Sequence, residues 1–371
     1  MKYRSLAVQI GLTIVPIVIS LVITALLIMA VNHDPREVFE KVWEGAFRDS
    51  RSFAQVVNFW IPLTLVSMGL IVTFTAGLWN IGVEGQMMLG AVAASWAALY
   101  VTLPSPLQIP FEIMVAIIGG ALWAALVGVL KTRLGVHEIF AGVGLNALAD
   151  VLSIYLISGP WQPPQGGSVH ATDPFPPTAV LPPFSNDFVV SPLMLIVALT
   201  AIVGITMMLR GTRWGLQLKA TGKNARSALL LGVPTGRSAL TAMMVCGALA
   251  GMAGAYRVLF TYNSLRPKVS GGIGFLGLLV VLLVANRGLW VPFVTFVFAS
   301  ILAGSTRLKV ATGLDQSLAG VLQEFLVLAV LLFNGLRQRL RRRKPDAMET
   351  PIEAEIKPAA HTATPEAVPH E

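Results

Sequence analysis

The 371-residue sequence contains little charge and little of the chemistry that builds covalent or metal sites. Charged residues make up 12% of the chain, about half the share found in water-soluble domains, which excludes an ordinary soluble globule. A single cysteine, Cys246, excludes an internal disulfide and a multi-cysteine zinc site. The five histidines are scattered without the spacing of metal ligands, so we expect no metal and no cofactor.

Hydrophobic residues make up 55% of the sequence and gather in long runs. A bilayer core about 30 Å thick needs roughly 20 apolar residues for each helical crossing. The runs are at residues 10–31, 59–79, 83–101, 112–130, 139–158, 192–209, 238–260, 273–285, 289–305 and 315–336. We therefore expect an all-α polytopic membrane protein with about ten transmembrane helices. The short run at 273–285 predicts a broken or partial crossing.

Basic residues are distributed unequally between the two sides of this arrangement. With the N-terminus inside, the inner segments hold 18 of the 27 Lys and Arg residues. Because Lys and Arg collect on the cytoplasmic side of membrane proteins, both termini are predicted to be cytoplasmic. The formal net charge of +8 then reflects topology, and we expect no nucleic-acid partner.

The predicted transmembrane domain, residues 10–336, is flanked by a short cytoplasmic N-terminus at 1–9 and interrupted by two long loops. Residues 159–191 are rich in proline, which predicts an ordered, extended loop on the outer side rather than a helix. Residues 210–237 form a basic loop that is predicted to be partly helical and cytoplasmic. Residues 337–371 are basic and then rich in Pro, Ala and Glu, a composition that does not support folding.

Three polar side chains, Asn80, Glu84 and Gln86, lie among glycines between two apolar runs. Unwound backbone at membrane depth occurs only where it is buried in protein or lines a water-filled path, so the segment is a candidate element beside a transport pathway. The alternative is a plain cytoplasmic turn, with Asn80 capping the next helix and Glu84 stabilised near its N-terminus.

Other polar groups fall inside predicted spans. Asn146 and Asp150 lie four residues apart, so Asn146 is placed to hydrogen-bond Asp150, and Glu324 lies in the last span. Each can face a cavity or join two helices by a hydrogen bond. Glycines at 247, 251 and 254 permit close helix packing. Gly272, Gly274 and Gly277 form a G-x-G-x-x-G pattern, but no βαβ unit surrounds it, which argues against dinucleotide binding.

Several motifs together resemble a known family. They are NIGVEGQMMLG at 80–90, KTRLGVHEI at 131–139 and RWGLQLKATGKNARSALLLG at 213–232. The sequence is similar to inner-membrane permeases of bacterial ABC importers, in the family of branched-chain amino acid and ribose-type permeases, and within it to the branch for nucleosides and simple sugars. The resemblance covers about residues 55–336. The Pro-rich loop resembles that of the larger permease of a nucleoside uptake system.

The resemblance implies a transport subunit in the bacterial inner membrane that is not itself an enzyme. Its implied partners are a separate ATP-binding subunit, a second permease, an extracytoplasmic substrate-binding lipoprotein, a small-molecule substrate and membrane lipid. A short helix around residues 216–231 would dock on the ATPase through Leu216, Lys219, Gly222, Asn224, Arg226, Leu229 and Gly232. The partly apolar face expected for this helix consists of Leu216, Leu218, Ala225, Leu229 and Leu230. Lys223 and Ala225 depart from the acidic residue and proline common in the family.

The sequence therefore predicts an ABC importer permease for nucleosides or related small polar solutes. Candidate pathway residues are Asn80, Glu84, Gln86, Asn146 and Phe275, whose ring could stack on a base. An ion-coupled secondary transporter is the alternative, with Asp150, Glu84 and Glu324 as coupling carboxylates. A membrane-embedded enzyme is the third class. Uptake that stops when the proton gradient collapses while ATP stays high would indicate the secondary transporter, and product formation in detergent without partners would indicate the enzyme.

Overall fold

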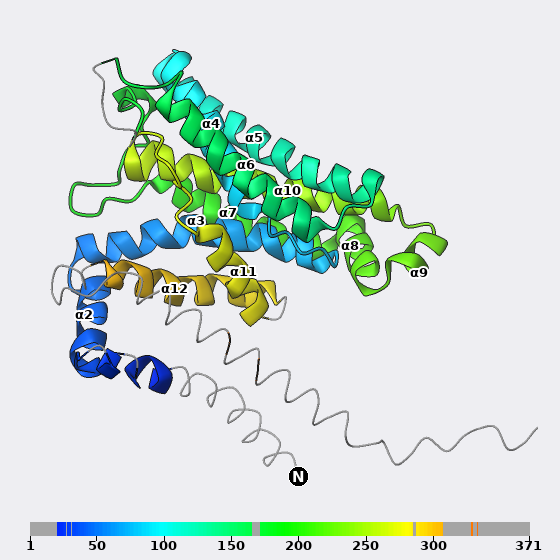
Figure 1. The fold of residues 1–371 in the computed structure, drawn as a ribbon, viewed down its shortest axis with the longest axis horizontal. Helices are drawn as coiled ribbons and strands as arrows, with labels where there is room; N and C mark the ends of the chain where they lie inside the picture. The colour runs from blue at the N-terminus through cyan, green and yellow to red at the C-terminus, as the bar shows by residue number, and fades with distance from the viewer. Residues whose placement is uncertain are drawn as a thin grey trace, which may run out of the picture. The chain divides into compact units, whose positions relative to one another are not determined.

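The computed structural model describes residues 21–26, 28–30, 32–164, 171–284 and 287–306, together with Leu328 and Leu332. The chain divides into two compact units, Met1–Leu331 and Leu332–Glu371, and all the elements below belong to the first. Throughout the described ranges, secondary structure is helical and no strand is present (Figure 1). The predicted all-α class is confirmed.

Most of the helices follow one another along the chain with short connections, and the long connection lies between α6 and α7. They are α2 (Pro35–Phe47), α3 (Ser50–Thr75), α4 (Val83–Tyr100), α5 (Ser105–Leu134), α6 (Glu138–Ser158), η1 (Pro177–Ala179), α7 (Pro192–Gly211), α8 (Arg213–Lys223), α9 (Ala225–Leu230), α10 (Thr235–Tyr256), η2 (Arg257–Tyr262), α11 (Ile273–Leu283), η3 (Gly288–Trp290) and α12 (Val291–Ser305).

Six helical segments in the described ranges are long and apolar enough to cross a membrane. They are Ser50–Thr75, Pro106–Leu134, Glu138–Ser158, Pro192–Gly211, Thr235–Tyr262 and Gly288–Ser305. The predicted number of about ten is not confirmed. Two apolar helices, Leu21–Ala30 and α11, are shorter, as expected for the 273–285 run. The predicted span at 315–336 lies outside the described residues except for Leu328 and Leu332, and Glu324 lies outside with it.

Two helices begin earlier than predicted and one was not predicted. α3 begins at Ser50 rather than at 59, because the Asp49 side chain caps it and accepts a 2.7 Å hydrogen bond from the Ser52 amide. α5 begins at Ser105, where prolines occupy the N-cap and the first turn, rather than at 112. α2 lies between the first two predicted spans, where the sequence analysis assigned no element, and Asp34 caps it while Pro35 starts it.

α4 lies inside the bundle, where it packs against α5, α6, α10 and α11 (Figure 1). Its contacts with α10 pass through Gly90 and Gly251, whose backbones approach too closely to admit a Cβ. α5 and α10 meet in the same way at Gly120 and Gly247. The close packing predicted from the glycines at 247, 251 and 254 is therefore confirmed. Most residues of α4 are buried against other helices. α4 therefore presents little surface to lipid and does not need an apolar face on its outer side.

The Pro-rich segment is ordered along its described residues, 159–164 and 171–191. Its only helix there is the short η1. Residues 172–181 run beside the segment that follows α10: the amide of Phe175 donates to the Asn263 carbonyl at 2.8 Å, and that of Leu181 donates to the Leu259 carbonyl at 3.0 Å. For these residues, the predicted ordered and non-helical conformation is confirmed.

The basic loop at 210–237 is partly helical, as predicted, but it contains two helices instead of one helix around 216–231. α8 ends at Lys223 and α9 begins at Ala225. Asn224 separates them in an extended conformation, and its side chain accepts a 3.0 Å hydrogen bond from the Ser227 amide. An N-cap residue requires non-helical backbone, so Asn224 ends α8 and starts α9.

Candidate functional site

The chain turns between α3 and α4 at residues 76–82. Gly77 adopts φ +75°, a conformation that favours glycine, and allows the chain to leave α3. Beyond it, the side chains of Asn80 and Gln86 form a reciprocal amide pair, with hydrogen bonds of 3.0 and 2.9 Å, and neither is accessible to solvent. Asn80 also donates to the Cys246 sulfur at 3.1 Å, which joins the turn to α10.

The sequence alternative that made Asn80 a helix cap is wrong. Gly82 occupies the N-cap position of α4 and makes no side-chain cap bond, while the Asn80 amide is paired with Gln86. The other half of that alternative is confirmed, because Glu84 lies in the first turn of α4. A buried pair of amides in mutual hydrogen bonds satisfies polar groups that would otherwise be costly inside the bundle.

Asn146 on α6 binds the backbone of this turn. Its side-chain oxygen accepts a 2.8 Å hydrogen bond from the Gly85 amide, and its side-chain nitrogen donates to the Ile81 carbonyl at 2.9 Å. Backbone groups in an irregular segment need such partners at membrane depth. Both ends of the amide therefore bind the turn, whereas the sequence paired Asn146 with Asp150, which lies one helical turn further along α6.

Glu84 connects α4 to α11. One carboxylate oxygen accepts a 2.8 Å hydrogen bond from the Gly272 amide, and the other accepts a 2.7 Å hydrogen bond from the Gly274 amide. These amides belong to the first turn of α11, where the helix dipole and unpaired N–H groups favour an anion. The glycine pattern at 272–277 thus binds a carboxylate of the same protein.

A buried cation orders the segment between α10 and α11. Arg257 is 5% exposed; its Nε donates to the Val269 carbonyl at 3.2 Å, and its guanidinium donates to the Tyr262 hydroxyl at 2.6 Å. The guanidinium also lies 5.7 Å from the centre of the Phe59 ring. From the sequence, Arg257 is one of several basic residues at the outer end of this helix, with Arg266 and Lys268, that could tune a receptor contact or an anionic environment, and its buried contacts were not predicted.

The structure joins four of the five candidate pathway residues, and the fifth, Phe275, directly follows Gly274, whose amide binds Glu84. Asn80, Glu84, Gln86 and Asn146 are joined through the turn and the start of α4. Phe275 on α11 has 47% of its surface exposed. Whether these residues contact a transported solute stays a prediction.

The candidate docking residues on α8 and α9 are mostly exposed. Leu216, Leu229, Leu230 and Leu231 are between 60% and 84% exposed, and Lys219, Asn224, Arg226 and Gly232 are also on the surface. Leu218 was assigned to the same apolar face, but it is fully buried in the core, because α8 packs against α3, α7 and α10. We call the four exposed leucines the leucine patch.

Gly222 lies at the C-terminal end of α8, beside the end of α3. Its backbone contacts the Thr75 carbonyl and Gly77 so closely that a Cβ would overlap them. Gly77 begins the turn that contains Asn80 and leads to Glu84. The C-terminal end of α8 is therefore packed directly onto the start of the polar turn, and α9 contacts α8 and α10.

These features define a multi-pass helical membrane protein with an internal polar turn and an exposed pair of short helices. Residues 52–333 match the family described as the permease component of branched-chain amino acid transport systems. The match covers most of the chain, so the protein belongs to this permease family. It is a multi-pass membrane protein that serves as a transport subunit.

Characterised relatives are similar over most of their length. The glucose ABC transporter permease TsgB13 of Haloferax volcanii is 27% identical over 86% of this chain and 87% of its own. The guanosine ABC transporter permease NupP of Bacillus subtilis is 26% identical over 87% of this chain and 93% of its own. The nucleoside ABC transporter permease NupB of Lactococcus lactis is 26% identical over 79% and 82%. A second permease from each of the last two organisms, NupQ and NupC, also matches.

Proposed function

We propose that this protein is the permease subunit of an ATP-driven importer of nucleosides. The observation that carries this proposal is its similarity, over most of both chains, to permeases named for guanosine and nucleoside transport. A glucose permease is equally similar, so a simple sugar is the second candidate solute. The ion-coupled alternative is not favoured, since the family and these relatives are transporter permeases of the ABC type.

The leucine patch is the proposed docking surface for the ATP-binding subunit. Its four side chains lie on α8 and α9, inside a loop whose basic residues predict a cytoplasmic location. Large exposed apolar side chains on a cytoplasmic segment are typical of a protein interface. Lys219, Asn224, Arg226 and Gly232 border the patch, and Gly222 connects it to the turn at 76–82.

The buried polar cluster is proposed to respond to ATPase docking. Nucleotide-driven movement of α8 would act on Gly77 through Gly222, and the Asn80–Gln86 pair and Glu84 would pass the displacement to α4 and α11. In this proposal Asn80, Glu84, Gln86 and Asn146 border the pathway and set its geometry. Phe275, exposed on α11, supplies an aromatic face for a nucleobase.

The remaining partners follow from the relatives and the outer loop. Because Bacillus subtilis and Lactococcus lactis each have two matching permeases, we propose a heterodimer with a second permease. The Pro-rich segment at 159–191 is proposed to face the substrate-binding lipoprotein on the outer side. We also propose that the transmembrane domain at residues 10–336 lies in the bacterial inner membrane, with residues 1–9 and 337–371 in the cytoplasm.

Uptake by the complete system in cells tests the proposal. Cells that express the permease with its partner subunits are supplied with radiolabelled guanosine, uridine or glucose, and uptake is compared with that of cells lacking this chain. We expect chain-dependent nucleoside uptake that stops when ATP is depleted and continues when a protonophore collapses the proton gradient. Uptake that stops with the gradient while ATP stays high would contradict the proposal. Uptake of glucose without uptake of either nucleoside would make a simple sugar the solute.

A pair of variants isolates the docking surface. Leu229→Asp with Leu230→Asp places two charges on the leucine patch, whereas Phe184→Asp changes an equally exposed residue in the Pro-rich segment. The ATP-binding subunit should co-purify with the wild-type chain and with the Phe184 variant, but not with the double variant. Recovery of the ATPase with all three chains would refute docking at this patch.

A further inference from the structure

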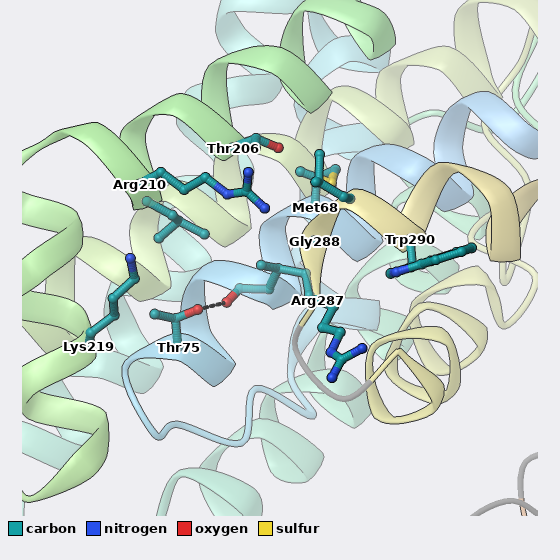
Figure 2. Close-up of a pocket in the computed structure, with 11 residues that line it drawn as sticks. Met68, Thr75, Thr206, Arg210, Lys219, Arg287, Gly288 and Trp290 are labelled. Carbon is teal, nitrogen blue, oxygen red and sulfur yellow. Dashed lines mark hydrogen bonds between the residues drawn. The ribbon is translucent and has the colours of Figure 1, made fainter. Parts of the chain in front are cut away.

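A pocket of about 420 Å³ lies at the end of α3, next to the polar turn, although none of the turn residues 76–82 lines it. Its walls come from the end of α3, the end of α7, one side of α8 and the connection before α12 (Figure 2). Because α3, α7 and α12 are long enough to cross a membrane, their ends mark the level at which apolar bilayer gives way to headgroups. The pocket is therefore at an interfacial depth.

Cations border the pocket on two sides. Figure 2 shows Arg210 and Lys219 on one side, and Arg287 with Gly288 and Trp290 on the other. Among the described residues, no acidic side chain lines the pocket and none forms an ion pair with any of these three cations. Like charges around one space repel each other, so an anion in the pocket would stabilise the arrangement.

The other walls have a different chemistry. Accessible apolar surface comes mainly from Leu289, which is 49% exposed, and from Trp290, which is 57% exposed, whereas the other apolar lining residues, Met68, Ile71 and Leu209, are buried. The hydroxyl oxygen of Thr206 is buried against the pocket without a hydrogen-bond partner in the described part of the chain. The pocket thus combines cations, a free hydroxyl and an apolar wall, which suits a ligand with a charged oxyanion and a hydrocarbon part.

We propose that this pocket binds the phosphate headgroup of an anionic phospholipid. Arg210 and Lys219 contact the phosphate, Arg287 approaches it from the opposite rim, and Thr206 donates to one of its oxygens. Guanidinium groups and hydroxyls are common partners of phosphate, and basic pockets between membrane helices bind anionic headgroups. The acyl chains then lie against the exposed side chains of Leu289 and Trp290, which a free phosphate would leave uncovered.

Lipid binding to the purified, delipidated full-length chain in neutral detergent tests this assignment. The probe is palmitoyl-oleoyl phosphatidylglycerol, with palmitoyl-oleoyl phosphatidylcholine and inorganic phosphate as comparison ligands, and native mass spectrometry counts bound molecules. Brominated phosphatidylglycerol should also quench Trp290 fluorescence, and Trp290→Phe should remove that part of the signal. We expect phosphatidylglycerol to bind at least tenfold more tightly than phosphatidylcholine.

Matched variants separate this pocket from general charge. Arg210→Gln with Lys219→Gln should weaken phosphatidylglycerol binding on the order of tenfold or more. Arg213→Gln with Lys223→Gln removes the same charge from residues of α8 outside the pocket and should change binding less than about twofold. Thr206→Val keeps every charge and nearly the same shape, and it should weaken binding about threefold.

Four results would overturn the proposal. Equal affinity for phosphatidylglycerol and phosphatidylcholine would show that the pocket does not recognise the anion. An equal loss of phosphatidylglycerol affinity in the two double variants would assign binding to general surface charge. Unchanged affinity in Thr206→Val would show that the lipid does not contact the pocket hydroxyl. Displacement of phosphatidylglycerol by an equal concentration of inorganic phosphate would make a soluble phosphate the ligand instead of a lipid.

Discussion

The carboxylate of Glu84 accepts a 2.7 Å hydrogen bond from the backbone amide of Gly274, which joins the first turn of α4 to the first turn of α11. The two residues lie 190 positions apart in the sequence. α11 spans eleven residues, too few to cross a bilayer, and its N-terminus lies inside the bundle. Glu84 accepts hydrogen bonds from two amides at this helix end, which have no partner within the helix.

Replacing Glu84 should destabilise the protein before it affects any solute. Glu84→Ala removes the acceptor of two buried amides and should lower the free energy of unfolding by about 3 kcal/mol. Glu84→Gln keeps one oxygen acceptor and should cost less. Circular dichroism of the purified variants during thermal unfolding in detergent shows which substitution lowers the stability more. If Glu84→Ala abolishes uptake but unfolds like the wild type, the carboxylate acts on the solute rather than on α11.

The amide pair of Asn80 and Gln86 should behave as one unit in a double-mutant cycle. Asn80→Leu leaves the Gln86 amide buried without its partner and should cost about 1–3 kcal/mol, as should Gln86→Met. The double variant removes both polar groups, so its cost should be smaller than the sum of the two single costs. Additive costs, measured by the same unfolding assay, would indicate that the two side chains are satisfied independently.

Close packing of α10 against α5 should make Gly251 intolerant of a methyl group. A Cβ at Gly251 would overlap the Ala116 carbonyl, a backbone group that cannot rotate away, and Gly251→Ala should cost about 1–3 kcal/mol. Gly204 on α7 is the matched control, because nothing lies within 4 Å of its Cβ position. Gly204→Ala should be neutral or stabilise the helix by up to about 1 kcal/mol. Equal unfolding midpoints for both variants would contradict the packing.

Contact between α8 and the end of α3 should be needed for coupling rather than for docking. Gly222→Ala places a methyl group against the Thr75 carbonyl and moves α8 away from Gly77, while the leucine patch is unchanged. On the proposed function, nucleoside uptake should fall at least tenfold although the ATP-binding subunit still co-purifies. Gly211→Ala, at a position with open space around its Cβ, should retain uptake. Loss of the ATPase from the Gly222 variant would make this contact part of docking.

The sequence by itself determined the class of the protein. Apolar runs of about 20 residues require helices that satisfy their own backbone in lipid, so the all-α membrane fold followed from composition. The short run near 273, the proline-rich segment and the glycines of α10 were also readable, because each reflects a local property of the chain. Hydropathy does not detect helix caps. The caps at Asp34 and Asp49 start α2 and α3 outside the predicted apolar runs.

Tertiary structure alone decided which polar groups meet. Sequence spacing paired Asn146 with Asp150 on one helix face, whereas Asn146 binds the Ile81 carbonyl in the turn and the Gly85 amide in the first turn of α4. No local pattern joins Glu84 to Gly274 or brings Lys219 to the same pocket as Arg287. Inside the bundle each exposed backbone group and buried charge must find a partner, and helix packing determines which partner is within reach.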